Sequence, residues 1–260
     1  MWERELSVSI KIAKEAGERI MEIYDDPDLW NIEYKDDRSP LTCADKASND
    51  IIVGALKKEF ASYAILSEEE KDNRERLEND YCFVVDPLDG TKEFIKRNGQ
   101  FTVNIALAYK HKSVMGVIYV PATRELYYAS IGEGAWYMDA HGKKARIYVS
   151  SNADHNDLSA VVSGSHPCEE MERMIEKYNI TNLLRIGSSL KGCLVAKGDA
   201  DIYYRHNPTM EWDTAAMQCI VEEAGGIFRQ MDDTEMLYNR ENSLNSKGFY
   251  AINRSENRLY

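Results

Sequence analysis

The sequence has few cysteines, and they are not arranged as a disulfide framework or a zinc site. Its five cysteines are odd in number and scattered, and no two of them form a CxxC pair. The expectation is therefore reduced, mostly buried thiols. They are Cys43, Cys82, Cys168, Cys193 and Cys219.

Long hydrophobic runs are also missing. No stretch approaches the roughly 20 apolar residues that a membrane-spanning helix needs. The first residues, MWERELSVSIKIAKEAG, form a charged amphipathic segment without the apolar centre of a signal peptide. We therefore predict a cytoplasmic protein with no integral membrane segment, and a peripheral association with the inner membrane stays open.

The chain has fewer basic than acidic residues. The chain has 32 Lys and Arg against 44 Asp and Glu, which gives a formal net charge of −12. Long nucleic acids would be repelled by such a surface, so they are not expected partners. A small phosphorylated substrate would be repelled too, unless bound metal ions or local cations reverse the sign at one site.

What is present fits a globular protein. The 260 residues, 43% hydrophobic and 29% charged, suffice for one large domain or two packed subdomains. Apolar residues at helical spacing predict a helix over 6–24, and a second one begins after Thr42. Residues 63–66, 81–85, 101–109, 114–120, 125–129 and 134–138 read as strands, mostly of an antiparallel meander.

From about residue 150 the pattern becomes alternating strands and helices. Strands are predicted at 160–163, 183–186, 201–204, 227–230 and 249–253, with helices at 169–178, 188–197 and 212–225. We therefore divide the chain into an N-terminal α+β subdomain (1–150) and a C-terminal α/β subdomain (151–260). No internal repeat or low-complexity segment is present.

The most informative stretch is residues 81–94, YCFVVDPLDGTKEF. An apolar strand ends abruptly at Asp86 and Asp89, with Pro87 fixing the turn and Gly90 permitting close approach of the backbone to a ligand. Two carboxylates held in this way are costly when unpaired. Mg²⁺ resolves that cost, because it takes oxygen ligands and is commonly shared with a phosphate. The alternative is an acidic surface turn.

Three further acids lie at the ends of predicted elements. Glu68 follows the strand at 63–66, and two adjacent strands would bring it beside Asp86. Asp45 and Asp213 each lie in the first turn of a predicted helix. Taken alone, each of these two is equally well explained as an acid that complements the helix dipole.

Four motifs occur in order: T-x-A-D at 42–45, L-S-E-E at 66–69, D-P-L-D-G-T at 86–91 and W-D-T-A-A at 212–216. Together they resemble the lithium-sensitive, magnesium-dependent phosphatase superfamily that includes the inositol monophosphatases. The runs at 86–95, 97–107 and 187–191 look like those of its bacterial 3'(2'),5'-bisphosphate nucleotidases. The resemblance implies a layered α/β (α+β) sandwich of the αβαβα type, with an antiparallel sheet in the first subdomain and the site in the cleft between the two.

The resemblance also implies a set of metal ligands. Glu68, Asp86 and the backbone carbonyl of Leu88 would hold one Mg²⁺, and Asp86, Asp89 and Asp213 a second, in a site of two or three ions. Metal ions in such a site polarise the phosphoryl group and lower the pKa of a bound water.

Catalytic roles follow from the same resemblance. Thr91, hydrogen-bonded to Asp45, would orient or deprotonate the attacking water, with Glu68 assisting. The backbone N–H groups of Gly90 and Thr91 would bind phosphate at a helix N-terminus.

The substrate side is implied in the same way. Ser165, His166, Ser189 and Lys191 would lie near the second phosphate or the base, and Arg205 would act as a bidentate phosphate partner. A surface histidine is the alternative for His166, and a structural arginine is the alternative for Arg205. Asp213 would also border the substrate.

The predicted activity is Mg²⁺-dependent removal of the 3'-phosphate of adenosine 3',5'-bisphosphate to give AMP, with the 5'-phosphosulfate analogue as a further substrate. The partner is thus a small phosphorylated nucleotide, and the chain would be a monomer or homodimer. Two alternatives stay open: a phosphatase for inositol monophosphate or another sugar phosphate, and a non-catalytic nucleotide or metal sensor.

Overall fold

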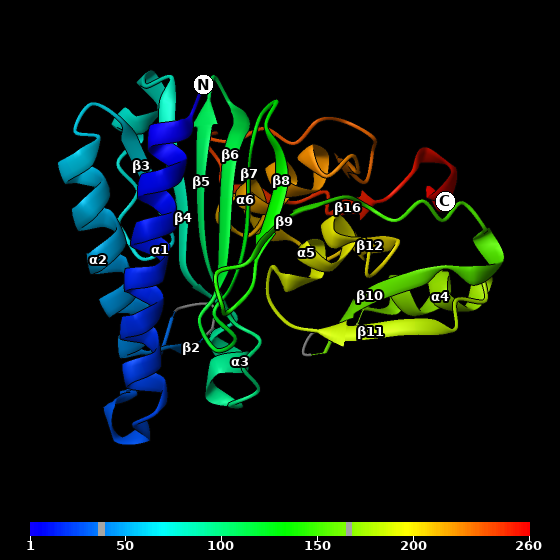
Figure 1. Cartoon of the computed structure of the whole chain (residues 1–260), viewed down its shortest axis with the longest axis horizontal. Helices are drawn as coiled ribbons and strands as arrows, with labels where there is room; N and C mark the ends of the chain where they lie inside the picture. The colour runs from blue at the N-terminus through cyan, green and yellow to red at the C-terminus, as the bar shows by residue number, and fades with distance from the viewer. Residues whose placement is uncertain (36–39, 165–167) are drawn as a thin grey trace.

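Helices and sheets alternate in five layers across the molecule. The computed structural model describes residues 1–35, 40–164 and 168–260. From left to right in Figure 1 the layers are a helix pair, a large sheet, a second helix pair, a smaller sheet and a single helix. This arrangement confirms the predicted layered α/β sandwich.

The first layer is the helix pair α1 (Glu3–Tyr24) and α2 (Cys43–Glu59), which lies against the large sheet (Figure 1). Buried positions of α1, such as Ile12 and Ile20, recur at helical spacing and face the sheet. Thr42 caps the N-terminus of α2 by accepting a hydrogen bond from a backbone N–H of the first turn. Both helices were predicted from the sequence.

The large sheet has seven strands in sequence order. They are β3 (Ala64–Ser67), β4 (Tyr81–Asp89), β5 (Thr102–Tyr109), β6 (Lys112–Val120), β7 (Glu125–Ser130), β8 (Gly134–Met138) and β9 (Lys144–Ile147). Both faces of its centre are apolar, so alternate residues enter different cores: Val85 packs toward α1 and α2, and Val84 packs toward the middle helices.

A bulge at the end of β4 decides where its two aspartates point. Asp86 pairs with Asn104 and Asp89 with Thr102, so three steps along β4 match two steps along β5. In a regular strand, residues three apart face opposite sides, and the extra residue of a bulge cancels that alternation. Pro87, which has no backbone N–H to donate, lies within the irregular segment.

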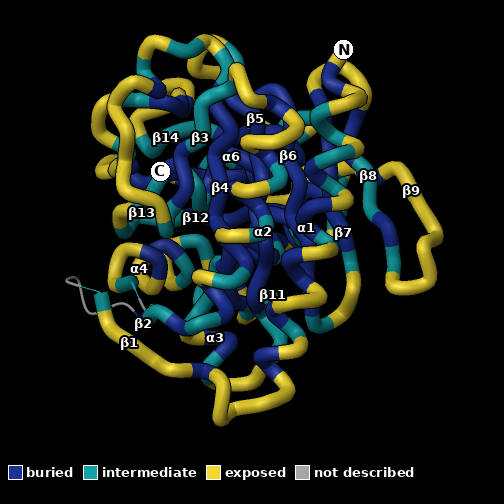
Figure 2. The backbone as a smooth tube through the Cα atoms, turned by 90° about the vertical axis from the view of Figure 1, so that its left-hand side faces the viewer, coloured by how far each residue is buried: buried dark blue, intermediate teal, exposed yellow. Residues whose placement is uncertain are grey.

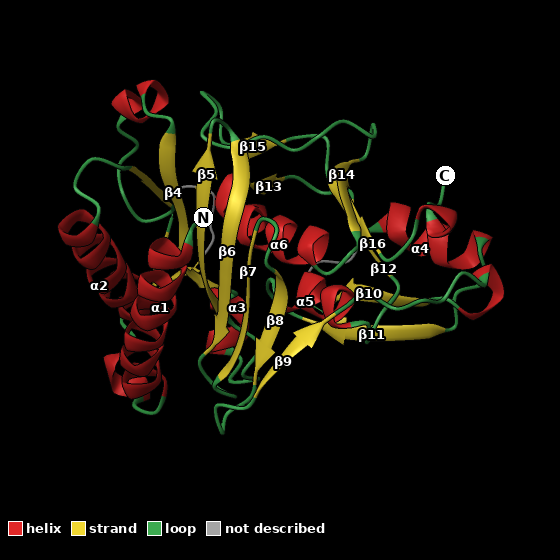
Figure 3. Ribbon diagram, turned by 45° about the horizontal axis from the view of Figure 1, so that its top comes forward, coloured by secondary structure: helices red, strands yellow, loops and turns green. Residues whose placement is uncertain are grey.

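The smaller sheet has the order β11 (Asn182–Ile186), β10 (Ser159–Ser163), β12 (Ile202–Arg205), β16 (Phe249–Ile252), β14 (Ile227–Gln230). Its first three strands are parallel and the last two antiparallel to their neighbours. Helix α4 (Glu169–Lys177) covers its outer face (Figure 3), and α5 (Leu190–Lys197) lies on the inner face.

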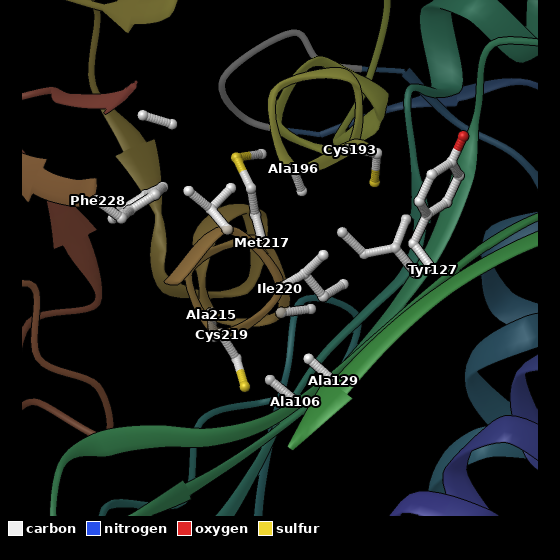
Figure 4. Packing of buried hydrophobic residues seen from close by; sticks show 14 of the residues in the cluster. Ala106, Tyr127, Ala129, Cys193, Ala196, Ala215, Met217, Cys219, Ile220 and Phe228 are labelled. Atoms are coloured by element: carbon white, nitrogen blue, oxygen red, sulfur yellow. The ribbon is translucent and has the colours of Figure 1, made fainter. Parts of the chain in front are cut away.

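The second helix of the middle layer, α6 (Glu211–Glu223), packs directly on the large sheet. Gly116 of β6 makes this possible, because a Cβ there would lie 2.4 Å from the backbone oxygen of Ala216. Side chains on the other flanks of α6, including Met217 and Ile220, fill the space between the two sheets and α5 (Figure 4). A helix from the C-terminal half therefore completes the core of the N-terminal sheet.

The remaining elements are short. They are α3 (Thr91–Ile95), β1 (Glu33–Tyr34), β2 (Pro40–Leu41), β13 (Thr209–Met210) and β15 (Leu244–Asn245), with 3-10 turns at Pro27–Leu29, Arg74–Glu78, His155–Asp157 and Ser255–Asn257.

Two details of the sheets differ from the sequence expectations. The large sheet is antiparallel except for β3, which runs parallel to β4 because the chain returns to the starting edge through residues 68–80. Strand β9 was missed because its first three residues are exposed and carry no apolar pattern, as Figure 2 shows at the sheet's edge. The last strand of the large sheet ends at residue 147, and the first strand of the smaller sheet begins at residue 159. The proposed subdomain boundary near residue 150 stays a prediction.

Candidate active site

Three aspartates from distant parts of the chain converge where β4, its bulge and the start of α6 meet. One carboxylate oxygen each of Asp86, Asp89 and Asp213 lies within 4.8 Å of the other two. Asp86 is buried and the other two are partly exposed. The bulge turns Asp89 to the side of Asp86, and α6 brings Asp213 to the same side of the sheet.

These carboxylates are electrostatically strained without a cation. Burial raises the pKa of Asp86 well above its ordinary value, and the negative charges of Glu68, Asp89 and Asp213 raise it further. Burial, followed by the charge of Asp89, raises the pKa of Asp213 to about 7. An all-oxygen, strongly anionic donor set of this kind fits a hard divalent cation such as Mg²⁺.

Glu68 lies at the edge of this group, at the end of β3. Its backbone N–H donates to the carbonyl of Val85 (3.2 Å), which places it beside β4 as predicted. Its carboxylate forms an ion pair with Lys35 (2.7 Å), and the same ammonium binds Glu69 (2.6 Å). Burial raises the pKa of Glu68 to about 6, although Lys35 lowers it. A cation at Glu68 must therefore share this carboxylate with Lys35.

Asp45 lies near the three clustered aspartates (the acidic triad Asp86, Asp89 and Asp213), and its carboxylate accepts several hydrogen bonds. Thr91 Oγ1 donates to Asp45 Oδ1 (3.0 Å), so the hydrogen bond expected from the sequence is present. Thr42 donates to the other oxygen of Asp45 through its N–H (2.7 Å) and its hydroxyl (2.6 Å). Burial raises the pKa of Asp45 to about 6, despite these donors. Asp45 thus both caps α2 and contacts Thr91.

A cleft of about 220 Å³ opens beside the carboxylates. Its lining includes most of the predicted site residues: Glu68, Asp89, Gly90, Thr91, Ser189, Lys191, Arg205 and Asp213. Gly90 has a φ of +97° and precedes α3, a conformation that favours glycine. Acidic side chains of the cleft, such as Asp89 and Asp213, thus share it with three cationic residues, Lys92, Lys191 and Arg205.

Two of these cations, Lys191 and Arg205, come from the C-terminal half of the chain. Lys191 is buried, its Nζ donates to the carbonyl of Ser188 (2.6 Å), and burial lowers its pKa. The Nε atom of Arg205 is buried and has no hydrogen-bond partner among the residues described. Arg205 is close enough to Asp213 that its positive charge lowers the pKa of that carboxyl.

Three predicted residues are placed less fully. Ser165 and His166 lie outside the described residues. Leu88 lies in the bulge between the two aspartates of β4 and is buried, and the role of its carbonyl as a metal ligand stays a prediction.

Sequence reasoning missed Asn104, a buried residue of β5 directly opposite Asp86. Its side chain lies 3.4 Å from Asp89 and 2.8 Å from Ser189. The signal was present, because Asn104 is a polar residue inside the otherwise apolar strand VNIALA. Lys35 was also missed, and nothing in its local sequence indicates an ion pair with residues more than 30 positions away.

Glu211 is another missed residue, and it fixes the start of α6. Its fully buried carboxylate accepts hydrogen bonds from the backbone N–H groups of Asn239 (2.5 Å) and Arg240 (3.0 Å). The Asn239 side chain in turn accepts a hydrogen bond from Arg76 (2.8 Å), in the segment that follows Glu68. This buried network joins the segment after β3 to the helix that carries Asp213.

The fold and this site define a class of protein. Residues 1–258 match the inositol monophosphatase family, so the chain belongs to that family. The resemblance seen in the four motifs is thereby confirmed.

Comparison with individual proteins shows which members of the family this chain is similar to. The chain is 40% identical over 255 residues to the 3'(2'),5'-bisphosphate nucleotidase CysQ of Buchnera aphidicola, covering 96% of this chain and 94% of the relative. It is 38% identical over 240 residues to the enzyme of the same name from Escherichia coli K12, covering 92% and 96%. The crystal structure of CysQ from Bacteroides thetaiotaomicron superposes with a TM-score of 0.84 at 40% identity, covering 97% of this chain and 98% of that one.

Among the residues that the structure describes, no helix is both long enough and apolar enough to cross a bilayer.

Proposed function

We propose that the chain is a Mg²⁺-dependent phosphatase that removes the 3'-phosphate of adenosine 3',5'-bisphosphate, leaving AMP and inorganic phosphate. The similarity to 3'(2'),5'-bisphosphate nucleotidases supports the reaction class. The observation that carries the choice of substrate is that Asp89 and Asp213 of the acidic triad line the same cleft as the cations Lys191 and Arg205. Such a cleft suits a molecule with two separated anionic groups.

Asp86, Asp89 and Asp213 would hold Mg²⁺, with Glu68 and the Leu88 carbonyl as further ligands and two or three ions in all. Bound Mg²⁺ supplies positive charge that polarises the phosphoryl group and acidifies water. The raised pKa values of Asp86 and Asp213 support this assignment, because a cation stabilises their ionised forms.

Thr91 and Asp45 would handle the proton of the attacking water. The Thr91 hydroxyl donates to Asp45, so its oxygen still has lone pairs to accept a hydrogen bond from water. As the water oxygen bonds to phosphorus, the water proton passes to Thr91 Oγ1, and the Thr91 proton passes to Asp45 Oδ1. The ester P–O bond breaks with its electron pair going to the ribose 3'-oxygen, which takes a proton from solvent water to become the hydroxyl of AMP. With a pKa of about 6, Asp45 is a stronger base than an ordinary aspartate and is still ionised at neutral pH. The two donors from Thr42 keep its carboxylate oriented.

Arg205 and Lys191 would bind the second phosphate. Arginine suits this role because its planar guanidinium can form two parallel hydrogen bonds to a phosphate. The buried Nε of Arg205 has no partner among the described residues, so a ligand phosphate would satisfy it. Gly90 and Thr91 would bind the phosphate that is removed, through their backbone N–H groups.

A second cavity gives room for the base. It has a volume of about 210 Å³ and shares Ser163, Tyr203 and Arg205 with the cleft. Part of its lining is apolar and includes Met171 and Ile175 of α4. An inositol phosphate would leave this space unfilled, whereas a nucleotide bound through Arg205 could place a flat base there.

The test is phosphate release in Mg²⁺, comparing adenosine 3',5'-bisphosphate with inositol 1-phosphate at equal concentration. We expect a strong preference for the nucleotide, and Arg205→Ala should raise its KM by about 10- to 100-fold, the value of one charge-assisted hydrogen bond. The variant should leave KM for inositol 1-phosphate nearly unchanged. Preference for the inositol ester would support a sugar-phosphate phosphatase, and binding without turnover would support a sensor.

The same proposal includes a cytoplasmic location, with peripheral membrane association open, and a monomeric or homodimeric state. Sedimentation of the purified protein would decide between monomer and dimer.

A further inference from the structure

A short relay of hydrogen bonds ends on one of the three clustered carboxylates. Ser189 Oγ lies 2.6 Å from Asp89 Oδ2, and Asn104 Nδ2 lies 2.8 Å from Ser189 Oγ. Asn104 Nδ2 is also 3.4 Å from the same carboxylate oxygen. Ser189 and Asn104 are each 1% exposed, so water does not compete freely for these contacts.

The direction of the relay follows from the donor inventory. An ionised carboxylate can only accept, so Ser189 donates its single proton to Asp89 and must accept from Asn104. The Asn104 amide therefore presents its N–H₂ group to the relay. Its buried Oδ1 has no hydrogen-bond partner among the described residues, which is costly. The opposite amide orientation would place this oxygen against the Asp89 carboxylate.

The relay joins separate parts of the fold. Asn104 lies opposite Asp86 on β5, and Asp89 ends β4, so both belong to the large sheet. Ser189 immediately precedes α5 in the C-terminal half. Its hydroxyl also lies 3.4 Å from the backbone carbonyl of Asp213, which places it between two members of the triad. The shorter distance to Asp89 identifies the carboxylate as the main acceptor.

We propose that Ser189 and Asn104 are positioning residues that orient Asp89 for metal binding, and that Ser189 is not a contact of the substrate's second phosphate. The inference rests on the proposed function, since it concerns the same metal site. The Ser189 proton is already committed to Asp89, and its oxygen already accepts from Asn104. Ser189 therefore fixes which carboxylate oxygen of Asp89 remains available to a cation.

Ser189→Ala tests the assignment. Loss of an outer hydrogen-bond partner typically weakens metal binding by about 10- to 100-fold, and we expect that range for Mg²⁺. The direct readout is calorimetric titration of the substrate-free protein with Mg²⁺. At saturating Mg²⁺, the KM for adenosine 3',5'-bisphosphate should remain that of the wild type. Ser189→Thr, which keeps the hydroxyl, should restore Mg²⁺ affinity.

Two further variants make the test specific. Ser188→Ala is the matched control, because Ser188 is a neighbouring buried serine of the same cleft whose hydroxyl oxygen accepts a hydrogen bond from the backbone N–H of Leu190. It should leave Mg²⁺ affinity unchanged. Asn104→Ala should weaken Mg²⁺ binding in the wild type, and much less in the Ser189→Ala background, because both act through one relay.

The outcomes separate this inference from the proposed function. An unchanged Mg²⁺ affinity in Ser189→Ala, with or without a raised KM for the nucleotide, would overturn the positioning role. An equal loss of affinity in Ser188→Ala and Ser189→Ala would also overturn it, since the effect would then be general to the segment. A wild-type protein that binds no Mg²⁺ would instead refute the metal site on which both proposals rest.

Discussion

Replacing Asp86 by asparagine should stabilise the metal-free protein while abolishing its activity. Asp86 is buried and lies with Asp89 and Asp213 in a cluster whose ligand oxygens are all within 4.8 Å of one another. At that separation, two unit charges repel by about 3.5 kcal/mol with an effective dielectric constant of about 20. The neutral amide of asparagine removes this repulsion and is close in size to the carboxylate.

The full repulsion will not be recovered, because protonation already relieves part of it. Burial and the neighbouring acids raise the pKa of Asp86, so the cluster takes up protons as the pH falls. At pH 8 in a chelator, we expect Asp86→Asn to raise the unfolding free energy by about 1–3 kcal/mol. For a protein of this size, that corresponds to an increase in Tm of about 2–12 °C.

Thermal unfolding in the chelator and in saturating Mg²⁺ is the assay. Mg²⁺ should reverse the order, because the wild type gains about 2.7 kcal/mol at a metal concentration 100 times its Kd and the variant gains little. Asp201→Asn is the matched control. Asp201 is also buried, but its carboxylate accepts hydrogen bonds from Ser150, Asn152 and Ser159, so its replacement should lower Tm in both conditions. A lower Tm for Asp86→Asn in the chelator would refute the reasoning.

Three other predictions follow from the site and its support. Thr91→Val should lower kcat by about 10²- to 10⁴-fold with little change in Mg²⁺ affinity, and steady-state rates restored by extra Mg²⁺ would contradict the proton-transfer role. Lowering the pH from 8 to 6 should weaken Mg²⁺ binding, measured by calorimetry, because protons compete for Asp213, whose pKa burial raises to about 7. The metal-free Tm should rise over the same interval, since the folded state binds more protons than the unfolded state there, and a falling Tm would argue against it. Gly116→Ala should lower the free energy of unfolding by about 1–3 kcal/mol and weaken Mg²⁺ binding. The reason is that a Cβ would lie 2.4 Å from the backbone oxygen of Ala216, in the helix that carries Asp213. Urea unfolding that matches the wild type would show that α6 can shift freely.

Much of the site was predictable because its residues follow elements that the sequence marks clearly. Asp86 and Asp89 end an apolar run, and Asp213 starts a strongly helical one. Side chains at the ends of buried elements keep a fixed place, so motif and geometry agree. The bulge that turns Asp86 and Asp89 to the same side was less accessible, since it depends on the register between β4 and β5.

Contacts between distant residues that no motif marks were not predictable. The ion pair of Lys35 with Glu68 joins two residues whose proximity only the folded chain creates. Strand β9 was missed for the opposite reason: it lies at an edge and buries little, so solvent-facing residues erase its pattern. Asn104 could have been found, because an asparagine inside an apolar strand needs a polar partner.

The place of α6 also bears on how the chain folds as it is synthesised. The seven strands of the large sheet are complete at Ile147, but the helix that covers their inner face ends only at Glu223. At about 5–20 residues per second, translation of the intervening segment takes roughly 4–15 s. During that interval the nascent sheet has one apolar face without its helix. The emerging N-terminal half therefore exposes an aggregation-prone apolar surface until α6 is made.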